Sequence, residues 1–413
     1  MNRRTFALVL VLVACSTRAS RIPAPRPAYP DRSIRVALTI PTPRVGATGD
    51  FRWFEADGRS FVANGRRDEQ WRVERESPGT RVRAVRPDGI PTVWQSGLLA
   101  RVNDDGMITV NGKRYRGEVF VLPIDTGLVV VNRLGTEDYL RGVVPVEMGS
   151  HPLGDSAALQ AQAVASRSYA YVRSVDGTGA FDLRATTADQ VYGGIDVESA
   201  YANDAIDATR GLVIRYGGRV VDAPFHSTCG GSTAEPSEIW RTEGAPYLQR
   251  VSDRIGTSDR YYCDIAPRYR WSRTLTASQL NAALDQYLRT YSTIPPGRPG
   301  TTRAIGVRDR TPSGRVAVLD VETERGIFPV RGNDIRYVLR APGSEILNST
   351  YFSVEPEYRD GLVSRVTFRG QGNGHGVGMC QWGAIGRARA GQSFRAILGT
   401  YYPGTTVGPV SSQ

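Results

Sequence analysis

Residues 132–174, NRLGTEDYLRGVVPVEMGSHPLGDSAALQAQAVASRSYAYVRS, decide the fold of this 413-residue chain. The apolar run at residues 143–146 is followed directly by Glu147. An acid at the rim of such a run is partly shielded from water, which raises its pKa and favours a proton donor. Pro145 removes a backbone donor and stiffens the approach, so we expect Glu147 to be held in a fixed pose.

The second half of this stretch predicts a buried helix. Asp155 or Ser156 can cap a helix that begins near Ala157. Alanine recurs along it, and small side chains let another backbone approach closely. Arg167 lies within this helix, and a buried arginine needs an anion or a carbonyl as partner. It can pair with Glu147, meet the negative charge of a substrate, or form a structural ion pair.

Five sequence blocks follow one another along the chain. They are EDYLRGVVPVEM (137–148), AALQAQAVASRSYAY (157–171), DQVYGG (189–194), FHSTCGGSTA (225–234) and GHGVGMCQWGA (374–384). In this order they resemble the SpoIID/LytB family of bacterial peptidoglycan-acting proteins, which includes a sporulation lytic transglycosylase and amidase enhancers. The resemblance extends over residues 101–407.

The resemblance implies an α+β fold and a lytic transglycosylase that uses a single acid. Glu147 would protonate the glycosidic oxygen while the 6-hydroxyl of the muramic acid attacks the anomeric carbon, leaving a 1,6-anhydro end. Arg167 would position a lactyl carboxylate or stabilise the developing charge. The alternative is a non-catalytic glycan-binding protein that enhances a cell-wall amidase. The predicted partners are therefore peptidoglycan glycan strands, preferably free of peptides, and a cell-wall amidase.

The same blocks, with a closing motif at residues 397–404, supply the remaining candidate site residues. Glycines around His375 let backbone amides and the imidazole approach a ligand closely. Gln381 adds a polar group, and Trp382 adds a face on which a sugar can stack. The predicted substrate-binding residues are Tyr169, Gln190, Tyr192, His226, Ser227, His375, Gln381, Trp382 and Tyr401.

The cysteines are expected to form one disulfide. In an oxidising compartment Cys229, Cys263 and Cys380 are an odd number of thiols, so one is left over. Cys229 and Cys380 both lie in the blocks of the resemblance, so the three are expected near one another. We expect a bridge between Cys229 and Cys263 and no cofactor. The alternative is a structural zinc site at the three cysteines, or a small metal site that includes His226 or His375.

The amino terminus predicts export and lipid anchoring. Residues 1–15, MNRRTFALVLVLVAC, have a positive start, a short apolar segment and a small residue before Cys15, as in a bacterial lipobox. Cleavage there would leave a lipidated Cys15 as the membrane anchor. Residues 16–32 are rich in proline and predict a tether to the folded body. We therefore expect a protein anchored to a bacterial membrane and facing the cell wall or periplasm.

The rest of the chain is expected to form a β-rich lobe and a mixed lobe with an insertion. Residues 33–131 read as strands separated by Asp-Gly and Asn-Gly turns. The mixed α/β core would comprise residues 132–268 and 351–408. Residues 269–350 look like an inserted subdomain that begins with a capping box at Thr276 and Gln279.

Charge and motifs exclude several other functions. The net charge of +11 is almost wholly arginine, which suits an anionic polymer, and for an exported protein we expect carboxylate-bearing glycan and not nucleic acid. The glycine-rich loop at residues 370–378 does not follow the G-x-G-x-x-G pattern, so it predicts no nucleotide site. Ser227 beside His226 lacks a G-x-S-x-G elbow. Three histidines without metal-ligand spacing do not support a zinc hydrolase.

Overall fold

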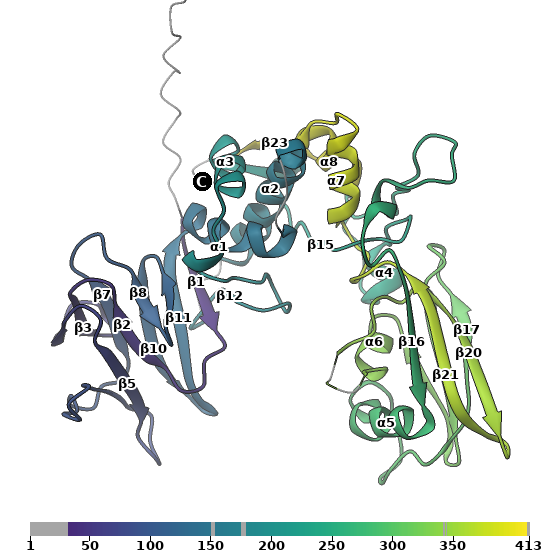
Figure 1. Ribbon diagram of the computed structural model, residues 1–413, viewed down its shortest axis with the longest axis horizontal. Coiled ribbons are helices and arrows are strands. Elements are labelled where there is room, and N and C mark those ends of the chain that lie inside the picture. Colours follow the sequence, from purple (N-terminus) through teal and green to yellow (C-terminus); the bar gives the residue numbers. More distant parts are fainter. Residues whose placement is uncertain (1–31, 150–152, 175–178, 342, 344, 411–413) are drawn as a thin grey trace, which may run out of the picture.

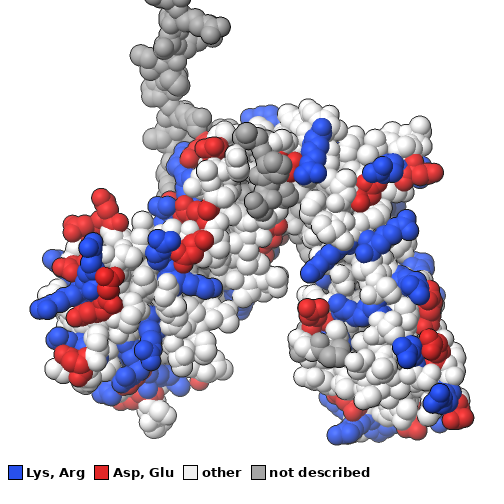
Figure 2. Space-filling model, in the orientation of Figure 1, with Lys and Arg blue, Asp and Glu red and all other residues white. Residues whose placement is uncertain are grey.

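The computed structural model describes residues 32–149, 153–174, 179–341, 343 and 345–410. The mixed α+β fold is confirmed: helices and several sheets form an arch, with a β-rich lobe on one side, a second lobe on the other and helices between them (Figure 1). On the face drawn in Figure 2, cationic and anionic side chains intermingle over both lobes. The predicted lipidation site Cys15 lies outside the described residues.

Two sheets form most of the β-rich lobe, and their strands pair antiparallel except for β12, which is parallel to β1. Tryptophan and phenylalanine side chains fill its interior: Phe51, Trp53 and Trp71 are at most 1% exposed, and their rings lie 6.0 to 6.4 Å apart. The larger sheet has the order β12-β1-β11-β10-β7-β3-β4 and the smaller β6-β5-β2-β8-β9. The strands are β1 (Ser33–Leu38), β2 (Arg44–Ala47), β3 (Phe51–Glu55), β4 (Phe61–Gly65), β5 (Gln70–Arg75), β6 (Val82–Val85), β7 (Leu98–Val102), β8 (Ile108–Val110), β9 (Lys113–Tyr115), β10 (Glu118–Ile124), β11 (Gly127–Gly135) and β12 (Leu183–Arg184).

The helical part continues directly from this lobe, because β11 ends at the residue immediately before α1 (Thr136–Met148). Buried side chains of the two parts belong to one hydrophobic core. The other elements of this part are η1 (Leu153–Asp155), α2 (Ser156–Arg173), η2 (Ile195–Val197), α3 (Ala200–Ala208), β13 (Leu212–Tyr216), β14 (Arg219–Val220), β15 (Phe225–His226), α4 (Pro236–Ile239), η3 (Tyr262–Ile265), β22 (Met379–Cys380), α7 (Gln381–Arg389), α8 (Phe394–Tyr401) and β23 (Thr406–Pro409).

Asp155 occupies the N-cap position of α2, as predicted, but its side chain does not cap the helix. The carboxylate instead accepts two hydrogen bonds from Arg389 of α7, at 2.7 and 2.9 Å. Asp155 is fully buried, so this pair ties the start of α2 to α7. The ion pair with Arg389 takes the place of the local cap, because an ionised carboxylate is costly to bury without a charged partner.

The second lobe has a hydrophobic core of its own, which extends from Leu275 to Phe368. Its two sheets have the orders β16-β21-β20 and β17-β18-β19. The expected boundary at residue 350 falls before β20 and β21, which the structure pairs with β16. The elements are β16 (Arg270–Thr276), α5 (Ala277–Tyr291), β17 (Thr302–Arg310), β18 (Val316–Thr323), β19 (Gly326–Arg331), α6 (Asp334–Val338), β20 (Phe352–Arg359) and β21 (Leu362–Gln371).

The capping box at the start of α5 is confirmed. The Thr276 hydroxyl accepts the Gln279 N–H at 3.3 Å, and the Gln279 side chain accepts the Thr276 N–H at 3.0 Å. Among the helices in the described part of the chain, none combines the length and the apolar character needed to cross a membrane.

Candidate active site

Glu147 lies in the last turn of α1, where it is partly buried. Its Oε1 accepts the backbone N–H of Val191 at 2.8 Å, and its Oε2 lies 3.5 Å from the amide nitrogen of Gln381. Burial raises the pKa of Glu147 above its usual value, and these two hydrogen bonds oppose the rise only in part. The carboxyl group is therefore held on both oxygens and biased toward its protonated form.

Glycosidases that use water normally place two carboxylates across the scissile bond. The shift in the pKa of Glu147 comes from burial and from the hydrogen bonds of Val191 and Gln381. The one-acid scheme that the resemblance implies stays a prediction.

The DQVYGG segment packs against α1 through a close backbone contact. The N–H of Gly193 donates to the carbonyl of Gly142 at 3.0 Å, and a Cβ atom at Gly142 would lie 2.5 Å from the Tyr192 ring. Glycine at position 142 thus lets the segment approach the helix. This contact brings the Val191 N–H to the carboxyl group one turn later in α1.

A buried polar chain on α2, which the sequence analysis missed, continues from the carboxyl group. The amide nitrogen of Gln381 lies 3.4 Å from the side-chain oxygen of Gln162, and the amide nitrogen of Gln162 donates to the Ser166 hydroxyl at 3.0 Å. Gln162 and Ser166 are fully buried. Their i, i+4 spacing among alanines is a signal that they share an inward face. The sequence pattern drew attention to Arg167 on this helix and not to these two residues.

Arg167 does not pair with Glu147, which excludes one of the three alternatives that the sequence left open. Its guanidinium forms a two-pronged salt bridge with Glu137, with both N–O distances 2.8 Å, and also donates to the carbonyl of Leu212 at 3.0 Å. The Arg167 side chain is 2% exposed and that of Glu137 7%. Arg167 is thus a structural ion pair that joins α2 to the start of α1. Glu137 was not recognised as its partner because the two lie 30 residues apart.

Several predicted substrate-binding residues are interior side chains. Gln190 and Tyr401 are fully buried; Gln190 accepts a hydrogen bond from Tyr139 at 3.0 Å, and Tyr401 donates to Asp253 at 2.7 Å. Tyr192 is 6% exposed and donates to Asn132 at 2.8 Å. These side chains are too deeply buried to bind a ligand directly, and their hydrogen bonds hold interior groups in place.

Tyr169 is also largely buried, with 8% of its surface exposed. Its hydroxyl donates to Asp189 at 3.0 Å, and the guanidinium of Arg173 lies 3.5 Å from its ring centroid. Asp189 in turn accepts the backbone N–H of Arg184 at 2.9 Å. Tyr169 therefore anchors the start of the DQVYGG segment to α2.

The two predicted histidines lie together, with ring centroids 5.4 Å apart. His375 uses both nitrogens on backbone groups: Nε2 donates to the carbonyl of Phe225 at 2.8 Å, and Nδ1 accepts the N–H of Val377 at 3.1 Å. Burial lowers the pKa of His375 to about 3 and that of His226 well below its usual value, so both rings are neutral.

Aromatic side chains extend the site beside the histidines. The ring of Trp240 lies 5.0 Å from that of His375 and is 38% exposed, which leaves one face for stacking. Trp382 is partly buried next to Gln381, and its backbone N–H donates to the carbonyl of Ser227 at 3.0 Å. Ser227 is thus fixed beside the start of α7.

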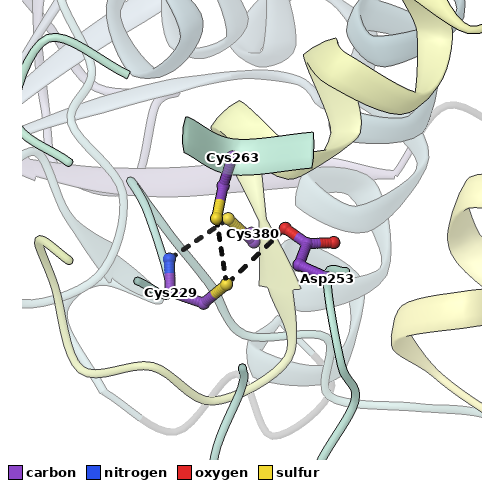
Figure 3. Close-up of side chains that lie close together, drawn as sticks. All are labelled: Cys229, Asp253, Cys263 and Cys380. Carbon is purple, nitrogen blue, oxygen red and sulfur yellow. Dashed lines mark hydrogen bonds between the residues drawn. The ribbon is translucent and has the colours of Figure 1, made fainter. Parts of the chain in front are cut away.

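The predicted disulfide between Cys229 and Cys263 is absent. The two sulfur atoms are 3.5 Å apart, against about 2.05 Å in a disulfide, and all three described cysteines are free thiols. Figure 3 shows Cys229, Cys263 and Cys380 converging with Asp253. The sequence analysis grouped the cysteines correctly but missed Asp253, which lies in none of the five blocks.

The chain is similar to known families in two regions. Residues 125–216 match the family of the stage II sporulation protein SpoIID, and residues 255–378 match a domain of unknown function, DUF8618. An uncharacterized protein of Brachyspira hyodysenteriae is 29% identical over 91% of this chain and 92% of its own length.

Two relatives with functional names are similar over a large part of the chain. The amidase enhancer of Bacillus subtilis is 32% identical over 73% of this chain, which spans 45% of that protein's length. Stage II sporulation protein D of Bacillus subtilis is 28% identical over 67% of this chain and 75% of its own length.

Proposed function

Because this chain belongs to the SpoIID/LytB family, we propose that it is a peptidoglycan lytic transglycosylase in which Glu147 is the general acid. Membership in this family supports a role at the cell wall. The observation that carries the proposal is the partly buried carboxyl group of Glu147, whose pKa is raised by burial and whose two oxygens are held by Val191 and Gln381.

The geometry assigns the acidic proton to one oxygen. Oε1 accepts the short hydrogen bond from Val191, whereas the contact of Oε2 with Gln381 is long, so Oε2 is the oxygen free to carry the proton. Glu147 donates this proton to the glycosidic oxygen as the bond to the anomeric carbon breaks. The 6-hydroxyl of the muramic acid attacks that carbon and returns its proton to Glu147. No water is consumed, and the product ends in 1,6-anhydromuramic acid.

Exchange of Glu147 for glutamine tests this scheme. Glu147→Gln keeps the shape of the side chain but has no transferable proton, so the release of anhydro-ended fragments should fall by about a hundred- to ten-thousand-fold. The measurement is mass spectrometry of purified glycan strands, with and without their peptides, after incubation with each protein. Glu243→Gln, which changes an exposed glutamate, is the control and should cleave like the wild type. Equal cleavage by Glu147→Gln would refute the assignment.

The second candidate function is enhancement of a cell-wall amidase. It is favoured by the similarity to the amidase enhancer of Bacillus subtilis. The test adds the wild type or Glu147→Gln to a purified peptidoglycan amidase and measures the release of peptides. Stimulation by both proteins, with cleavage of glycan by neither, would replace the transglycosylase with the enhancer.

Export is part of the proposal, since the substrate lies outside the cytoplasm. The lipobox at residues 12–15 supports anchoring through Cys15 to a bacterial membrane, with the folded body facing the cell wall. Contact with the membrane is assigned to that anchor alone, and the partners are the glycan strands and a cell-wall amidase, not nucleic acid.

A further inference from the structure

Three cysteines and one aspartate from separate parts of the chain meet in the interior. Cys229 follows β15, Cys263 lies in η3, Cys380 ends β22, and Asp253 precedes η3. All four side chains are buried, and one potential ligand atom from each lies within 4.8 Å of all the others (Figure 3). The glycan chemistry proposed for Glu147 uses none of them.

The spacing of these atoms fits a tetrahedral zinc site. Zn–S bonds of about 2.3 Å and Zn–O bonds of about 2.0 Å place neighbouring sulfurs about 3.8 Å apart and a sulfur and an oxygen about 3.5 Å apart. The sulfurs of Cys229 and Cys263 are 3.5 Å apart, and Cys229 Sγ lies 3.6 Å from Asp253 Oδ2. These sulfurs are too distant for a covalent bond and close to the edge of such a tetrahedron.

The carboxylate of Asp253 is oriented in the manner of a metal ligand. Its Oδ1 accepts hydrogen bonds from Tyr401 at 2.7 Å and from Arg387 at 3.0 Å, which leaves Oδ2 directed toward the thiols. Hydrogen bonds to the outer oxygen of a ligating carboxylate fix its pose in metal sites. Cys380 Sγ likewise accepts the N–H groups of Cys229 at 3.2 Å and of Gly383 at 3.3 Å, both suited to a thiolate.

Buried positive charge surrounds the cluster. Arg315 is 1% exposed and donates to the carbonyl of Cys229 at 2.7 Å, while its Nε and NH1 have no hydrogen-bond partner among the described residues. Arg387 contacts Asp253. Three thiolates and one carboxylate carry four negative charges, and a divalent cation with Arg315 and Arg387 balances them. A buried arginine with an incomplete set of acceptors is expected beside such an anionic cluster.

We propose that Cys229, Asp253, Cys263 and Cys380 bind one Zn²⁺ ion in a closed, structural site. Four protein ligands leave no position for a substrate or water, which is typical of structural zinc. The ion would join the segment after β15, the segment before η3, η3 itself and the end of β22, directly before α7. Since Gln381 follows Cys380 directly and contacts Glu147, the site would also fix the position of this contact.

The test is metal analysis of the full chain, purified with reductant and without chelator. We expect one zinc per chain, loss of zinc on strong chelation, and protection of all three thiols from alkylation until the metal is removed, as mapped peptide by peptide. With Co²⁺ in place of zinc, the protein should show the absorption of a tetrahedral thiolate complex. A protein that binds no zinc after dialysis against it, or that has Cys229 and Cys263 linked with Cys380 free, would overturn the proposal.

Two carboxylate variants identify the fourth ligand. Asp253→Asn should weaken zinc binding at least about tenfold and change the Co²⁺ spectrum. Asp259→Asn is the matched control, because this carboxylate is four residues from Cys263 but fully exposed, so the affinity of this variant for zinc should be unchanged. Equal zinc affinity in wild type and Asp253→Asn would exclude the carboxylate as a ligand. Neither measurement depends on cleavage of glycan.

Discussion

Replacement of Arg167 by methionine distinguishes a structural ion pair from a substrate contact. Methionine has a similar length but no charge, so Glu137 would keep its buried carboxylate without the two 2.8 Å hydrogen bonds from the guanidinium. Both side chains are at most 7% exposed, so little solvent is available to compensate. Removing one partner of such a pair costs about 3–5 kcal/mol of folding free energy.

The reverse change, Glu137→Gln, should cost a similar amount of folding free energy, because it leaves the Arg167 guanidinium buried without an anionic partner. The double variant should cost about as much as one single variant and not their sum. Its remaining penalty comes from backbone groups that lose a partner, such as the Leu212 carbonyl, at about 1–3 kcal/mol each. A non-additivity of this size is the signature of a direct buried interaction.

The measurement is native-state hydrogen exchange of α1 and α2, together with urea unfolding. The described chain has two large hydrophobic cores, so a global transition need not be a single step, whereas exchange reports the stability of these helices locally. Both single variants should exchange faster in α1 and α2 and lose activity in proportion. If Arg167→Met abolished cleavage of glycan while leaving exchange unchanged, Arg167 would contact the substrate and the structural assignment would be refuted.

Two further predictions concern the surroundings and the charge of Glu147. Gly142→Ala should reduce both stability and glycan cleavage, because the added methyl group would lie 2.5 Å from the Tyr192 ring and displace the segment that carries the Val191 N–H. The control is Gly399→Ala, at an open helical position in α8. It should be neutral or slightly stabilising in the same thermal and activity assays. Because burial raises the pKa of Glu147, the folded protein retains this proton to higher pH than the unfolded chain, so this group's contribution to stability falls as pH rises from its usual value near 4.5 through the raised pKa. The thermal midpoint of Glu147→Gln, relative to that of the wild type, should therefore increase as the pH rises. A constant difference between the two midpoints across this range would contradict the raised pKa.

Local sequence signals predicted much of the fold. Alternating apolar residues and Asp-Gly turns indicated the β-rich lobe, and the capping box at Thr276 and Gln279 located the start of α5. These features involve neighbours in sequence, whose geometry follows from backbone periodicity and short-range hydrogen bonds. The position of Glu147 at the end of an apolar run likewise indicated a shielded acid, and the structure shows a partly buried carboxyl group whose pKa burial raises.

Pairings between distant residues were decided only by the tertiary structure. Sequence chemistry required a partner for Arg167 but left Glu147, a substrate and another acid as equal choices, and packing of α2 against α1 selected Glu137. The cysteines were expected together, yet only the folded backbone determines whether two sulfurs approach to bonding distance and whether Asp253 joins them. The sequence by itself indicated that Glu147 is shielded and that a buried Arg167 needs a partner. The identity of each partner depends on long-range packing, because hydrogen bonds and metal sites require positions accurate to a few tenths of an ångström, which no local pattern specifies.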